Sequence, residues 1–155
     1  MAKGPWEERV GMLLDEPHFI YKHKCPDVGP HGGKVKIDWL ACDNLGQFFM
    51  VEVKEIRTVQ TVFHIDNEVT PLQQEALSAV GCGGISLVAV GHGRTANEHA
   101  KYTTGLYVMP WNWLNAQENR SVDMTKAPRL FFPWKGSKSF VTEQNKKDFW
   151  LWQQR

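Results

Sequence analysis

The chain lacks the features of exported, membrane-spanning and disulfide-stabilised proteins. Its 155 residues contain no apolar stretch that approaches the length of roughly 20 residues that a membrane-spanning helix needs. The N-terminal segment Met-Ala-Lys-Gly-Pro-Trp has no apolar signal core. The few cysteines, Cys25, Cys42 and Cys82, form no CxxC pair and no disulfide framework. We therefore expect a cytoplasmic protein without a membrane segment.

Metal-binding cysteines and a strong charge of one sign are also missing. Cys25 lies near His23 and His31, but this spacing fits no common set of zinc ligands. The net charge is only +1, so the overall charge gives no sign of a polyanionic partner. What the chain does have is apolar content, 42% over 155 residues, which is enough for one domain with its own core. We expect a single domain over residues 1–155.

The most informative stretch places charged residues inside two strand-like runs. Residues 35–42 and 47–53 are rich in β-branched and aromatic residues, and Asp43-Asn44-Leu45-Gly46 between them has turn composition. A three-residue loop with Gly46 at the position of positive φ would place Asp38 directly across from Glu52. Such neighbours have Cβ atoms about 5 Å apart. Lys54 lies two residues beyond Glu52 and faces the same side of the strand.

This arrangement predicts a metal-dependent phosphodiesterase site. A buried charge is costly unless it is paired or binds a metal. Hard cations such as Mg²⁺ take carboxylate oxygens, acidify a bound water and offset charge on a phosphate. A lysine beside them can orient the attacking water or stabilise the transition state. The simpler interpretation is a surface ion pair between Glu52 and Lys54 with a solvated Asp38, which the apolar neighbours on both strands disfavour.

The pattern Asp38…Glu52-Val53-Lys54 resembles the core of the PD-(D/E)xK nuclease superfamily. Pro26-Asp27 also precedes the Glu-x-Lys, but it lies in a segment of loop composition, so Asp38 is preferred. Downstream, a helix over about 71–80 leads to Gly81-Cys82-Gly83-Gly84 and the apolar run Ile85–Val90. That order is similar to Holliday-junction resolvases of the archaeal Hjc and bacterial RecU types.

The resemblance covers about residues 4–110 and implies a restriction-endonuclease-like mixed α/β core, a central β-sheet flanked by helices. It implies that Asp38 and Glu52 hold Mg²⁺, with Mn²⁺ able to substitute, and that Lys54 is the catalytic lysine. The N-terminal acid of the family matches Glu8, a further metal or water ligand, with Glu7 as the alternative. The family's glutamine, near the lysine and the phosphate, matches Gln73, with Gln74 left open.

The function expected from this resemblance is a homodimeric endodeoxyribonuclease that resolves four-way DNA junctions. Alternatives are another nuclease of the superfamily, for restriction or repair, and a non-catalytic DNA-binding module. Basic residues near the acidic pair are candidates for phosphate contacts, or else solvated surface. They are Lys22, Lys24, Lys34, Lys36 and Arg57.

Residues 104–110 are expected to form the last core strand, and beyond them the chain has a tryptophan-rich extension, residues 111–155. Aromatic clusters anchor interfaces and also stack on unpaired bases. We expect the extension to pack on the core or at a dimer interface, with DNA stacking second, and residues 146–152 to form a terminal helix. Residues 18–23 and 85–91 are predicted strands, and residues 56–69 an extended segment.

Overall fold

A computed structural model describes residues 5–25, 37–93, 105–134 and 140–154. Within these ranges a six-stranded sheet has the strand order β1-β2-β3-β5-β6-β8. All neighbouring strands are antiparallel except β3 and β5, which are parallel. The strands are β1 (Phe19–Lys24), β2 (Trp39–Asp43), β3 (Phe48–Ile56), β5 (Ile85–His92), β6 (Gly105–Pro110) and β8 (Leu130–Pro133).

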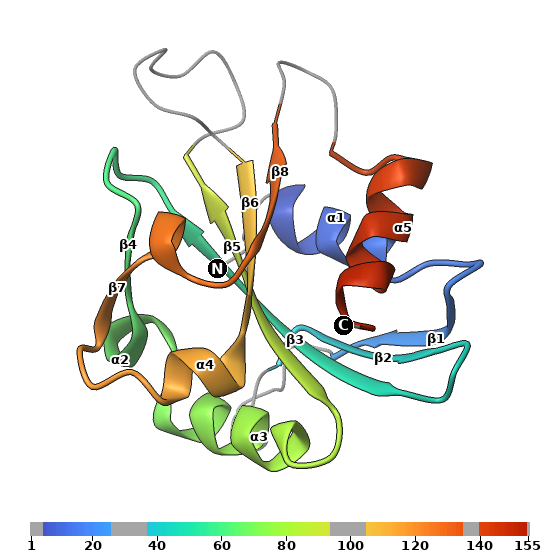
Figure 1. Ribbon diagram of the computed structural model, residues 1–155, viewed down its shortest axis with the longest axis horizontal. Coiled ribbons are helices and arrows are strands. Elements are labelled where there is room, and N and C mark those ends of the chain that lie inside the picture. Colours follow the sequence, from blue (N-terminus) through green and yellow to red (C-terminus); the bar gives the residue numbers. More distant parts are fainter. Residues whose placement is uncertain (1–4, 26–36, 94–104, 135–139, 155) are drawn as a thin grey trace.

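Helices cover both faces of this sheet (Figure 1). On one face α1 (Pro5–Leu13) lies beside α5 (Glu143–Trp152), and on the other α3 (Pro71–Gly81) lies beside α4 (Trp111–Asn115). A second, two-stranded sheet pairs β4 (Val62–His64) with β7 (Ser121–Asp123). The short helices α2 (Ile65–Glu68) and η1 (Met124–Lys126) follow those two strands.

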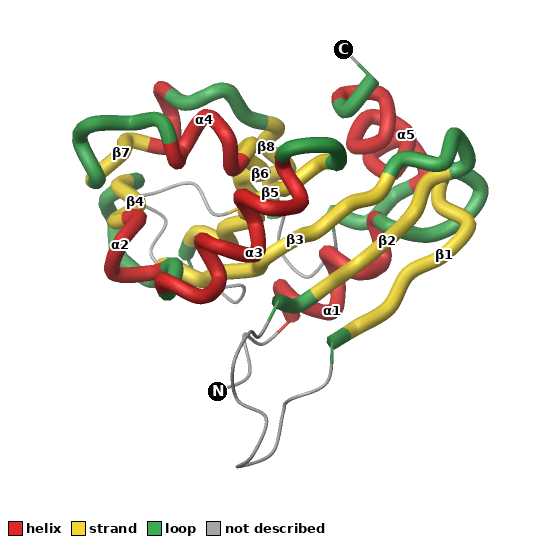
Figure 2. The backbone as a smooth tube through the Cα atoms, turned by 90° about the horizontal axis from the view of Figure 1, so that it is seen from below, coloured by secondary structure: helices red, strands yellow, loops and turns green. Residues whose placement is uncertain are grey.

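The alternation of side chains along β3 gives the sheet two separate cores. Phe49, Val51 and Val53 are buried against α1 and α5, and Met50 packs on the core beneath α3 and α4. Side chains alternate between the two faces along a strand, so Glu52 and Lys54, two and four residues after Met50, face the same side as Met50, the side of α3. The tube view in Figure 2 shows β3 running through the middle of the molecule, with α3 along it.

Most expected elements are present, and two expectations were wrong. The segment expected to be extended over residues 56–69 contains only the short strand β4, and α2 follows it directly. The strand β6 is not the last of the sheet, because β8 pairs along its other edge. The predicted terminal helix is confirmed as α5, whose Phe149 is buried in the core against Phe19.

Candidate active site

The β2–β3 hairpin brings Asp38 and Glu52 to adjacent positions. Trp39 pairs with Val51, so Asp38, just before β2, falls at the position opposite Glu52. The predicted turn is confirmed: Gly46 has φ 82°, and the Asp43 carboxylate accepts hydrogen bonds from the backbone N–H groups of Leu45 and Gln47. This local chemistry sets the register on which the site depends.

Both carboxylates are buried. Asp38 is 3% exposed and Glu52 is fully buried, which rules out the solvated interpretation of this pair. Asp38 Oδ2 accepts a hydrogen bond of 2.8 Å from the backbone N–H of Val53, so this carboxylate points across the hairpin toward β3. Two acidic groups are thus held on one side of the sheet, where water reaches them poorly.

Lys54 and Gln73 complete the polar cluster. The Lys54 ammonium lies 3.0 Å from Glu52 Oε2 and donates to Gln73 Oε1 at 3.1 Å. Gln73 Nε2 donates to the same Glu52 oxygen at 3.2 Å. The amide of Gln73 therefore bridges the lysine and the carboxylate, presenting its oxygen to the cation and its nitrogen to the anion.

A capping box at the start of α3 orients that amide. The Thr70 hydroxyl accepts from the backbone N–H of Gln73 at 3.2 Å, and Gln73 Oε1 accepts from the backbone N–H of Thr70 at 3.1 Å. The same amide oxygen thus closes the helix terminus and binds Lys54. Thr70 was not among the residues expected at the site, although Thr70-Pro71-Leu72-Gln73 has the capping-box spacing with proline at the first helical position.

Of the two adjacent glutamines, Gln73 faces the cluster. Gln74 turns away, and its Nε2 donates to Asp66 and to the carbonyl of Val69.

The two adjacent acids of α1 also differ in position. Glu8 is exposed. Glu7 is partly buried, its Oε1 lies 3.7 Å from Lys24 Nζ, and its carbonyl accepts from the Trp39 indole at 2.9 Å. Because Trp39 directly follows Asp38, the indole contact ties Glu7 to the start of β2, next to Asp38.

Of the basic residues expected to contact DNA phosphates, the three that the structure describes are all ion-paired. Lys22 pairs with Asp15 and Lys24 with Glu7, while Arg57, directly after β3, pairs with Glu55 of that strand. Lys34 and Lys36 lie outside the described residues. Contacts between these five basic residues and DNA phosphates therefore stay a prediction.

The carboxylates of the cluster affect the pKa of a neighbouring thiol, that of Cys25. Burial raises the pKa of the Cys25 thiol, and the carboxylates of Asp38 and Glu52 raise it further. The backbone N–H of Cys25 donates to the Asp38 carbonyl at 3.1 Å, which fixes this cysteine beside the hairpin.

The donor set fits a magnesium ion. In the described part of the chain no three His, Cys, Asp or Glu residues gather closely enough to hold a cation. Among the residues that the structure describes, the hairpin contributes two buried carboxylates, Asp38 and Glu52. Mg²⁺ is commonly bound by one or two carboxylates with waters and substrate phosphates as its other ligands.

No protein-family model and no curated protein sequence matches this chain. Within the described residues no helix is long and apolar enough to cross a membrane. Among solved structures the chain is similar to Hjc from Archaeoglobus fulgidus, a Holliday junction resolvase from an archaeal hyperthermophile. The TM-score is 0.54 and the identity 19%, over 82% of this chain and 93% of that one. This likeness confirms the restriction-endonuclease-like α/β fold expected from the sequence.

Proposed function

We propose that this protein is a divalent-metal-dependent endodeoxyribonuclease that resolves four-way DNA junctions. The observation that carries the proposal is the pair of buried carboxylates, Asp38 and Glu52, with Lys54 3.0 Å from Glu52. The cost of burying these charges is offset when they bind a cation. The choice of a branched substrate rests on the fold shared with Hjc and on the resemblance carried by Gln73 and Gly83-Gly84.

Asp38 and Glu52 would hold Mg²⁺ or Mn²⁺, which supplies a more acidic water and offsets charge on the phosphate. Hydrolysis adds water to the phosphorus and breaks the P–O3′ bond, which leaves 5′-phosphate and 3′-hydroxyl ends. Lys54 places a positive charge beside the reacting phosphate, where it stabilises the developing negative charge. Gln73 holds Lys54 and Glu52 at a fixed separation through its two-sided amide.

An acid on α1 would assist by positioning water or metal. Glu8 is the residue that the resemblance assigns, but Glu7 is less exposed and is tied to Trp39. We therefore include Glu7 as the alternative. Measuring junction cleavage by Glu7→Gln and by Glu8→Gln would show which of the two acids assists. The two-fold symmetry of a homodimer would place matching active sites on the two DNA strands that must be cut to resolve a junction.

The test compares the wild type with Asp38→Asn on a labelled four-way junction, a matched linear duplex and a flap, with Mg²⁺ and with EDTA. The expected result is symmetric, Mg²⁺-dependent nicking of the junction alone, lost in the variant while binding persists. Equal cutting of the duplex would instead indicate a restriction or repair nuclease. Binding without any cutting by the wild type would indicate a DNA-binding module and refute the enzymatic proposal.

A further inference from the structure

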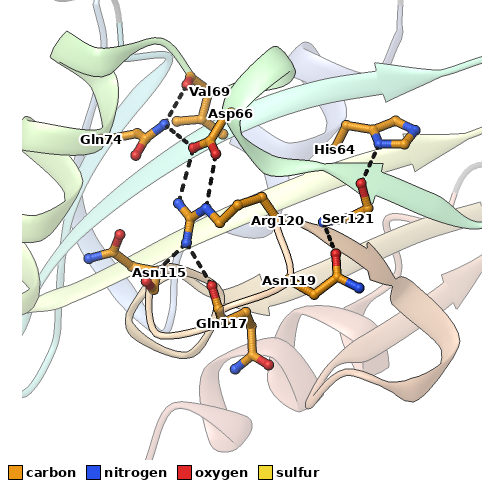
Figure 3. A network of polar contacts seen from close by, with 9 residues as sticks. All are labelled: His64, Asp66, Val69, Gln74, Asn115, Gln117, Asn119, Arg120 and Ser121. Atoms are coloured by element: carbon orange, nitrogen blue, oxygen red, sulfur yellow. Dashed lines mark hydrogen bonds and ion pairs between the residues drawn. The ribbon is translucent and has the colours of Figure 1, made fainter.

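A polar network links the segment after α4 to the first turn of α3 (Figure 3). Arg120 Nε and Nη2 each donate to one carboxylate oxygen of Asp66, both at 3.1 Å. Arg120 Nη1 donates to the carbonyls of Asn115 and Gln117 at 3.1 and 3.0 Å. One guanidinium thus joins the end of α4 to α2 through a two-pronged ion pair, a geometry that a lysine cannot reproduce.

The next link runs from α2 to α3. Asp66 Oδ1 also accepts from Gln74 Nε2 at 3.1 Å, and that nitrogen donates to the Val69 carbonyl at 2.9 Å. The backbone N–H of Ile65 donates to the Arg120 carbonyl at 2.8 Å, so α2 is held from both its backbone and its side chain. Figure 3 shows Asp66 lying between Gln74 and Arg120.

The network ends one residue from the candidate active site. Successive residues of an α-helix point about 100° apart, since there are about 3.6 per turn. Gln74 can therefore reach Asp66 while Gln73 reaches Glu52 and Lys54. Holding the Gln74 side chain restrains rotation of this first turn about the helix axis, and with it the direction in which Gln73 points.

The other end of α3 is fastened by the same part of the chain. The Trp111 indole donates to Ser78 Oγ at 2.9 Å, and Asn112 Nδ2 donates to the Gly81 carbonyl at 3.0 Å. These contacts fix the position of the helix. The Arg120 network restrains the opposite end of α3, the first turn, which carries Gln73.

We propose that Arg120, acting through Asp66 and Gln74, is a positioning residue that aims the Gln73 amide at Glu52 and Lys54. It would contribute to the active site from the extension beyond Pro110, a part of the chain that the sequence resemblance did not include. This inference rests on the proposed function for its effect on catalysis, but not for its effect on Gln73.

The first test follows Gln73 directly and needs no activity. Protein labelled with ¹⁵N-glutamine gives side-chain amide signals, and the Gln73 pair is assigned by its loss in Gln73→Ala. In Arg120→Ala we expect these signals to shift and their exchange with water to quicken, with a smaller change in Arg120→Lys. Lys146→Ala removes the cation of another ion pair, with Glu143, and should leave Gln73 unchanged.

If Arg120→Ala does not fold, Arg120→Lys carries this test, because it keeps the charge and loses only the two-pronged geometry. Unchanged Gln73 signals in a folded Arg120 variant would overturn the proposal.

The second test separates positioning from general loss of stability. Single-turnover cutting of the four-way junction is measured for Arg120→Lys, Gln73→Ala and the double variant. We expect Arg120→Lys to slow cutting about tenfold with unchanged junction affinity, because small displacements of reacting groups are costly. In the Gln73→Ala background the same change should matter less than about twofold, since the residue through which it acts is gone.

An equal reduction in both backgrounds would contradict the route through Gln73. A wild type that cuts no DNA would refute the proposed function, and the amide signals would still decide the positioning of Gln73.

Discussion

Removing the Lys54 ammonium should destabilise the protein more than the loss of an ordinary ion pair. In Lys54→Met the fully buried Glu52 loses the cation 3.0 Å from its Oε2. Gln73 Nε2 remains as a donor to that oxygen, but a neutral amide cannot replace the charge. We therefore expect a large loss of stability in the metal-free protein.

The magnitude follows from burial. At 3.0 Å the Coulomb attraction is about 5.5 kcal/mol for an effective dielectric constant of about 20. The side chain of Lys54 is 13% exposed and that of Glu52 is fully buried, so screening by water is weak. Breaking a buried pair by removing one partner costs about 3–5 kcal/mol, and Gln73 leads us to expect the lower end, about 3 kcal/mol.

The assay is urea denaturation in EDTA of Lys54→Met, Glu52→Gln and the double variant. The double variant should recover most of the loss, because the carboxylate whose charge Lys54 offsets is then removed as well, which gives a coupling of about 3 kcal/mol. Arg57 and Glu55 provide the matched control: Arg57 Nε lies 2.9 Å from Glu55 Oε1 at the end of β3, but the Arg57 side chain is 57% exposed. Their coupling should stay below about 1 kcal/mol. Equal couplings for the two pairs would refute the reasoning.

Three further predictions concern packing in the core, the loss of stability at low pH and the effect of the site's negative charge on the reactivity of Cys25. A Cβ at Gly91 would overlap the buried ring of Trp6, so Gly91→Ala should lower the free energy of unfolding by about 2 kcal/mol in urea, whereas Gly83→Ala, with open space around its Cβ, should not. Hydrogen bonds from Thr125 and Thr61 lower the pKa of Asp123, so its stabilising contribution is present at neutral pH and lost as the pH falls through that pKa. The variant Asp123→Asn should flatten the acid limb of a stability–pH curve, and an unchanged limb would contradict this account. Because Glu52 helps raise the pKa of Cys25, Glu52→Gln in a Cys42→Ser, Cys82→Ser background should speed alkylation of Cys25 at pH near 8, and an unchanged rate would argue against the field.

The hairpin was predictable because its signals are local. The turn residues and the alternation of apolar side chains lie within the same short stretch, and the structure has the expected register and the positive φ of Gly46. One register places Asp38, Glu52 and Lys54 on one side, so the charged cluster followed from the turn.

Elements that depend on distant partners were not predictable in the same way. The strand β4 pairs with β7, whose residues follow nearly sixty positions later in the chain, and β8 is a short run that becomes a strand only beside β6. Neither run is long enough for its own periodicity to indicate a strand. The Arg120 network belongs to this class, since its members come from α2, α3 and the segment after α4.

The choices between adjacent residues needed the helix geometry. Gln73 and Gln74 are equivalent by composition, and their different directions follow from the capping box that starts α3 at Pro71. Glu7 and Glu8 likewise differ only once α1 is placed on the sheet, where Glu7 contacts Trp39. Spacing alone leaves an uncertainty of one residue on a helix, and that residue decides which side chain faces the site.

The most direct test of the account is divalent-metal binding by the folded protein. Titration of Mn²⁺ followed by calorimetry should show binding by the wild type and by Lys146→Ala, which removes a charge far from the hairpin in sequence. Asp38→Asn and Glu52→Gln should each abolish that binding while the protein stays folded. Undiminished Mn²⁺ affinity in both carboxylate variants would contradict the claim that these two buried side chains form a metal-binding hydrolytic site.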